Sequence, residues 1–153
     1  MADPLAEQII EALRTRLALI RTVNGFATNA GVTVLHGRLR TDTDDLHLAC
    51  FAGAAGEKED RGRNRIDVLL QVEVAACVPV PDSDTGGRVV ELVIGDIQKA
   101  LELPARSLGG IARDLTPLGR QRLAPIEGTR NEFVSLTYVV SYFRLYGSPD
   151  QRV

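Results

Sequence analysis

The feature of this sequence that most constrains its fold is an alternation of apolar and polar residues from Arg65 to Pro79. A period of two is the pattern of a β-strand with one buried face. The apolar positions are Ile66, Val68, Leu70, Val72 and Val74, and the polar ones include Asp67, Gln71 and Glu73. Because a strand needs partners, and residues 46–52 also have strand character, we expect the two to form an antiparallel hairpin.

The segment between these two strands, from Gly53 to Asn64, is rich in glycine and in charge. Such a segment is too polar to pack in a core. We therefore expect a flexible charged hairpin loop at 53–64, which is either a solvated tip or an arm that becomes ordered on a protein partner. Its candidate interaction residues, with the first residue of the next strand, are Glu57, Lys58, Glu59, Asp60, Arg61, Arg63 and Arg65.

Two other stretches have the three-and-four spacing of a helix with one apolar face. The first runs from Leu5 to Ile20, after a start signal at Asp3-Pro4 and before a stop signal at Asn24-Gly25. The second runs from Val89 to Leu101, and the proline- and glycine-rich residues 79–87 before it predict a break.

The last long element is a strand over residues 133–146, with aromatic and β-branched residues and apolar side chains on both faces. Such a strand is either an inner strand covered on both sides or lies at a subunit contact. Tyr142 and Arg144 within it are of residue types that protein interfaces favour, so they are further interaction candidates.

Weaker patterns predict short strands at 32–35 and 122–127 and a helical turn or two within 105–119. The order helix, strands, helix, strands then predicts one α+β domain over residues 1–153. It should consist of a mainly antiparallel sheet packed against two principal helices.

Charge and hydropathy exclude two classes of partner. The 18 basic residues are outnumbered by 20 acidic ones, whereas a nucleic-acid surface needs uncompensated positive charge. No uncharged apolar stretch approaches the roughly 18 residues of a membrane span, and we recognise no signal peptide, so we expect a cytoplasmic protein.

Cys50 and Cys77 lie among apolar neighbours, which favours reduced, buried thiols over a disulfide.

We find no pattern of catalytic, cofactor-binding or metal-binding residues. His36 and His47 with the two cysteines lack the short spacings of zinc sites. The acidic residues 42–45 resemble the start of a calcium loop but are not followed by its glycine and glutamate. We therefore expect no enzyme activity, no cofactor and no metal, and a protein that works by binding other proteins.

Residues 13–38, 65–80, 89–101 and 133–149 resemble, in type and order, the tail terminator proteins of long-tailed bacteriophages. This resemblance implies a subunit that closes into a hexameric ring on the end of the tail tube. The ring would stop tube growth and give the docking surface for the head connector. The implied partners are further copies of the chain, the tail tube protein and the head–tail connector protein. The implied location is the virion, after assembly in the cytoplasm of the host bacterium.

Two alternatives stay open. One is another ring protein of the head–tail joint, and the other is a small oligomeric ligand-binding or regulatory α+β module. The state of assembly separates them, because a ligand module should be a small closed oligomer with a deep pocket.

Overall fold

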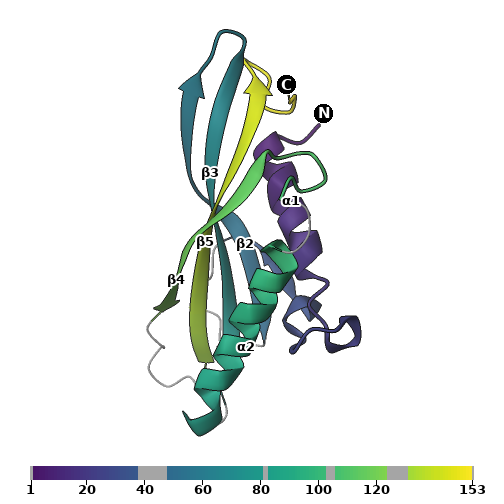
Figure 1. The fold of residues 1–153 in the computed structure, drawn as a ribbon, viewed down its shortest axis with the longest axis vertical. Coiled ribbons are helices and arrows are strands. Elements are labelled where there is room, and N and C mark those ends of the chain that lie inside the picture. Colours follow the sequence, from purple (N-terminus) through teal and green to yellow (C-terminus); the bar gives the residue numbers. More distant parts are fainter. Residues whose placement is uncertain (1, 38–47, 81–82, 103–105, 124–130, 153) are drawn as a thin grey trace.

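The computed structural model describes residues 2–37, 48–80, 83–102, 106–123 and 131–152, and these form a five-stranded sheet with two helices on one face (Figure 1). The spatial order of the strands is β1-β2-β3-β5-β4, and only β1 and β2 are parallel. The predicted α+β class, with a mainly antiparallel sheet on two helices, is confirmed. The elements are α1 (Leu5–Leu17), β1 (Val34–His36), β2 (Ala49–Arg61), β3 (Arg65–Pro79), α2 (Ser83–Glu102), β4 (Asp114–Leu123) and β5 (Asn131–Leu145).

The main core lies between the two helices and the facing side of the sheet. The apolar positions of β3 are buried there, whereas Leu69 and Gln71 on the other face are exposed. Leu13 and Leu17 of α1 are fully buried, as the helical spacing predicts. Each buried leucine contributes about 1.5–3 kcal/mol relative to an exposed one.

Helix α1 starts and ends differently from the prediction. Pro4 occupies the N-cap position, so Asp3 does not cap the helix, and the helix ends at Leu17. The chain continues through a short 3-10 turn, and Gly25, with a φ of 85°, closes that turn instead of α1. The early end has a packing reason: Gly31 returns against the last turn, where an added Cβ would lie 2.2 Å from the carbonyl oxygen of Leu17.

Helix α2 begins at Ser83, so the predicted break is wrong from that residue onward. Gly86 lies in the first turns of the helix, where an added Cβ would come within 2.2 Å of Val80 Cγ1. This glycine therefore serves close packing between the end of β3 and α2. No helix within the described ranges combines the length and apolar character needed to span a lipid bilayer.

Asp96 of α2 is a buried acid that holds the loop after α1 in place. Its Oδ1 accepts a hydrogen bond from the backbone N–H of Ala27 at 3.1 Å. Its Oδ2 accepts from the N–H and the hydroxyl of Thr28, both at 2.7 Å. The charge is thus satisfied by three donors from one loop, as a buried carboxylate requires.

The predicted loop at 53–64 is wrong for most of its length. Strand β2 continues to Arg61 and pairs with β3, so only residues 62–64 connect the two strands. Residues 54–61 are exposed although they are paired, because this half of β2 is the edge of the sheet. A charged sequence can form a strand there because neither face of the strand has to be buried.

A β-bulge lies between Ala54 and Gly56. Before it, Ala52 faces the helices, and after it Glu57 and Glu59 do, opposite Leu70 and Val68 of β3. The bulge therefore absorbs one extra residue and decides which charged side chains face the helices.

The weaker predictions have mixed outcomes. Strand β1 overlaps the predicted 32–35, but Leu115 lies in strand β4, not in a helical turn. Strand β5 lies between β3 and β4. It is therefore an inner strand, which is one of the two positions predicted from its two apolar faces. Residues 42–45, His47 and the predicted strand residues 124–127 lie outside the described residues.

Candidate protein-interaction surface

One end of the sheet extends past the start of α1 as a three-stranded projection, which we call the arm (Figure 1). It consists of residues 56–61 of β2, 65–70 of β3 and 141–145 of β5. Among the described strands, only β1 pairs with the outer edge of β2, and it reaches no further than Ala52. Unpaired backbone N–H and C=O groups along such an edge can bind another strand.

Four of the predicted interaction residues meet each other on the helix-facing side of the arm. The hydroxyl of Tyr142 donates to Glu57 Oε1 at 3.2 Å, and Arg144 Nη2 donates to Glu59 Oε1 at 2.6 Å. Both contacts cross over β3, so they tie β5 to the exposed strand β2. Burial, and then the Glu57 carboxylate, raise the pKa of Tyr142, while the hydrogen bond to Glu59 raises the pKa of Arg144. These groups therefore stabilise the arm, and Tyr142 itself is buried.

Two of the predicted arginines lie over aromatic rings. The guanidinium of Arg61 is 4.6 Å from the ring centroid of Tyr146, and that of Arg65 is 4.0 Å from the centroid of Phe143. Such contacts contribute roughly 0.5–1 kcal/mol at exposed sites. The side chains of the remaining predicted residues make no hydrogen bond, ion pair or ring contact to another described residue. They are Lys58, Asp60 and Arg63.

The open face of the arm, away from the helices, carries a depression of about 300 Å³. Leu69 and Phe143 form its apolar part, and the guanidinium of Arg113 lies 4.4 Å from the centroid of the Phe143 ring. Lys58 and Asp60 are charged residues of its lining. An apolar centre with a charged rim is typical of protein interfaces.

Sequence reasoning missed Leu69, Phe143 and Arg113 as members of this surface. One signal was present, because Leu69 is an apolar residue at a polar position of the β3 alternation, and its side chain is 47% exposed. Arg113 carried no signal, since it reaches Phe143 only through the pairing of β4 with β5.

The two cysteines are free and buried, as predicted. Cys50 belongs to the main core under the helices, whereas Cys77 lies on the opposite face of the sheet with Phe51 and Phe133. Burial raises the pKa of Cys50 to about 12 and that of Cys77 to about 11. Because the two thiols lie on opposite faces of the sheet, they cannot ligate one metal ion together.

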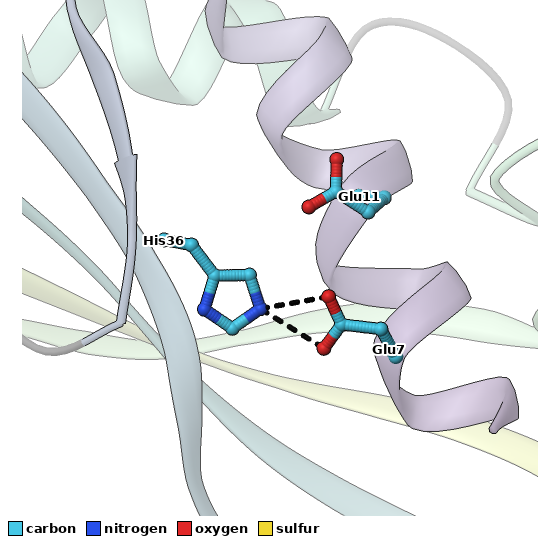
Figure 2. Close-up of side chains that lie close together, drawn as sticks. All are labelled: Glu7, Glu11 and His36. Atoms are coloured by element: carbon cyan, nitrogen blue, oxygen red, sulfur yellow. Dashed lines mark hydrogen bonds and ion pairs between the residues drawn. The ribbon is translucent and has the colours of Figure 1, made fainter. Parts of the chain in front are cut away.

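A second cluster, which sequence reasoning did not find, joins α1 to β1. Figure 2 shows the ring of His36 directed at the carboxylate of Glu7, with Glu11 one helical turn along. His36 Nε2 lies 2.9 Å from each carboxylate oxygen of Glu7. One potential ligand atom from each of the three residues lies within 4.8 Å of the others. The helical spacing of Glu7 and Glu11 was visible in the sequence, but the position of His36 was not.

Comparison with known proteins identifies a similar fold but no sequence relative. No protein-family model matches the chain, and no curated protein matches it significantly. A solved structure described as the virion of a native gene transfer agent (GTA) particle contains a chain that is similar, with a TM-score of 0.56 and 10% sequence identity. The match covers 87% of this chain and 92% of that chain, so the likeness extends over the whole fold and not over one motif.

Proposed function

We propose that this chain is a structural subunit of a phage-like virion and that it works by binding other proteins, not as an enzyme. The observation that carries the proposal is the fold match to a chain of a GTA virion particle, which spans nearly all of both chains. The buried, protonated thiols also argue against cysteine chemistry, because the thiolate is the nucleophile.

Within this class we propose the role of a tail terminator. Copies of the chain form a ring, hexameric by the sequence resemblance, on the end of the tail tube. The ring stops growth of the tube and gives the docking surface for the head connector. Assembly takes place in the cytoplasm of the host bacterium, and no nucleic acid is recognised directly.

The arm has features that contacts within a ring would require. A closed ring requires heterologous contacts, in which one patch meets a different patch on the next subunit. The arm offers two unlike patches: the outer edge of β2 beyond Ala52, with which no described strand pairs, and the open-face depression around Leu69 and Phe143. The charges along residues 57–61 oppose indiscriminate strand pairing, so only a partner of matching charge should bind this edge.

Lys58 and Asp60 of the arm and Arg63 in the connection at its tip are the charges best placed to contact a partner, because their side chains are exposed and make no hydrogen bond, ion pair or ring contact with other described residues. We propose that the connection at residues 62–64, which the hydrogen bond from the N–H of Gly62 to the carbonyl oxygen of Arg65 closes, contacts a neighbouring subunit or the tail tube. Ion pairs formed there are partly exposed, so binding should weaken as the salt concentration rises.

The test is electron microscopy of the purified chain mixed with tail tubes, together with crosslinking at high concentration. We expect rings at one end of each tube and tubes of limited length. A Leu69→Lys variant should remain folded, since Leu69 is exposed, and should no longer form rings. Leu118→Lys is the matched control, because Leu118 is an exposed leucine of β4 outside the arm.

Other outcomes distinguish the alternatives. Rings that bind isolated connectors but not tube ends would indicate another ring protein of the head–tail joint. Symmetric dimers alone, with no density on tubes or connectors, would contradict the proposal and favour a ligand-binding or regulatory module.

A further inference from the structure

The cluster of Glu7, Glu11 and His36 combines one imidazole and two carboxylates from two elements that are remote in sequence. Glu7 and Glu11 project from the same side of α1 because they are four residues apart. His36 is the last residue of β1, where its pairing with Ala52 of β2 fixes its backbone. Both supports are regular elements, so the three side chains are held by the fold and not by a loop.

The potential ligand atoms of the three side chains lie close together. His36 Nε2 is 2.9 Å from both oxygens of Glu7, and an oxygen of Glu11 completes a group within 4.8 Å (Figure 2). Atoms bound to one ion at about 2.0–2.2 Å are at most roughly 4.4 Å apart, so these exposed side chains have to close by no more than a few tenths of an ångström to share an ion. The side chains are between 38% and 50% exposed, so an ion and its waters can enter from solvent.

Arg14 stabilises this arrangement from outside. Its Nη1 donates to Glu11 Oε1, and its Nη2 donates to the carbonyl oxygen of Val34 at 3.2 Å. The second Glu11 oxygen is left for an ion, while Arg14 orients the carboxylate and fixes the spacing between α1 and β1. Outer partners of this kind orient metal ligands in proteins.

We propose that Glu7, Glu11 and His36 bind a divalent transition-metal ion, for which we take Zn²⁺ as the probe. The imidazole nitrogen favours such ions over Mg²⁺ and Ca²⁺, which prefer oxygen ligands alone. The bound ion offsets the repulsion between two neighbouring carboxylates and links α1 to the short edge strand β1. Three protein ligands leave a position for water.

The experiment is a calorimetric titration of ZnCl₂ into the full chain, treated with chelator and free of any polyhistidine tag. We expect one ion per chain in the wild type. Affinity should be at least about tenfold lower in Glu7→Gln and in His36→Gln, because each removes one of three ligands. Mg²⁺ and Ca²⁺ should bind at least about tenfold more weakly than Zn²⁺. Thermal melts of each variant without metal check that it is folded.

Glu132→Gln is the matched control, because Glu132 pairs with Arg122 in another part of the sheet. The affinity of this variant for Zn²⁺ should equal that of the wild type. NMR gives a second readout: the chain has two histidines, so the ring signals of His36 are assigned by their loss in His36→Gln. Zn²⁺ should shift these signals. An unchanged affinity in His36→Gln, equal binding of Ca²⁺, or no binding at about 1 mM Zn²⁺ would overturn the proposal.

Discussion

The contact between Asp96 and the loop after α1 gives a prediction whose magnitude follows from the structure. Replacing Asp96 by alanine leaves the N–H groups of Ala27 and Thr28 and the hydroxyl of Thr28 without their acceptor. These bonds are part-buried and their acceptor is a buried carboxylate, so each of the two backbone bonds contributes about 1–3 kcal/mol, whereas the Thr28 hydroxyl can turn to another acceptor. We therefore expect Asp96→Ala to lower the free energy of unfolding by about 2–6 kcal/mol.

This loss is a large share of the total stability of a small domain, which is typically about 5–15 kcal/mol. Two graded variants separate the terms. Thr28→Ala removes the hydroxyl contact to Asp96 and the long, 3.4 Å hydrogen bond that the hydroxyl accepts from the N–H of Ala30, and it should cost about 1 kcal/mol. Asp96→Asn keeps one oxygen acceptor but turns an NH₂ group toward a donor, so its cost should lie between those of the other two variants.

Urea unfolding followed by circular dichroism gives the free energies, and hydrogen exchange reports on the loop directly. The amides of Ala27 and Thr28 should exchange faster in Asp96→Ala than in the wild type. Glu91→Ala on the same helix is the control, because Glu91 forms an exposed pair with Arg120 and should cost no more than about 0.5 kcal/mol. A loss below about 1 kcal/mol in Asp96→Ala, with unchanged exchange at both amides, would refute the reasoning.

Four further predictions concern the core and the arm. Leu17→Asp should cost several kcal/mol and reduce soluble yield, because it places an unpaired charge at a fully buried site; a parent-like urea midpoint would contradict it. Gly31→Ala should cost about 1–3 kcal/mol in the same assay, because its Cβ would meet backbone atoms of Leu17 that cannot move alone. Tyr142→Phe should cost about 1 kcal/mol by loss of the hydrogen bond to Glu57, and an unchanged stability would show that this bond adds nothing. Burial raises the pKa of both cysteines, so the folded chain keeps protons that unfolded thiols lose from about pH 9. The free energy of unfolding should therefore fall as the pH rises toward 12, and it should fall less in a Cys50→Ala variant.

Elements with one buried face could be predicted from the sequence. The alternation in β3 gave its bounds, and the apolar stripe of α1 identified the residues that pack on the sheet. The outer half of β2 could not be predicted, because an edge strand with solvent on both faces has no apolar period and resembles a charged loop.

Of the candidate surface, sequence reasoning identified the residues but not their partners. Glu59 and Arg144 were both predicted to contact another protein, yet they bind each other across β3, which depends on the register of two strand pairs. The meeting of Glu7 with His36 likewise depends on how α1 crosses the edge of the sheet. Such contacts come from the tertiary arrangement, which local sequence patterns do not encode.

The bulge in β2 makes the geometry of an assembly adjustable separately from its chemistry. Ala55 has no partner of its own in β3, since Ala54 pairs with Val72 and Gly56 pairs with Gln71. Deletion of Ala55 would leave all residues of the arm on their present faces. It would also straighten the strand, because a bulge bends a strand and increases its twist. One residue at this position would therefore set the direction in which the arm points. In a ring held by arms, related chains could change the spacing between subunits, and with it the diameter of the ring, without replacing a single contact residue.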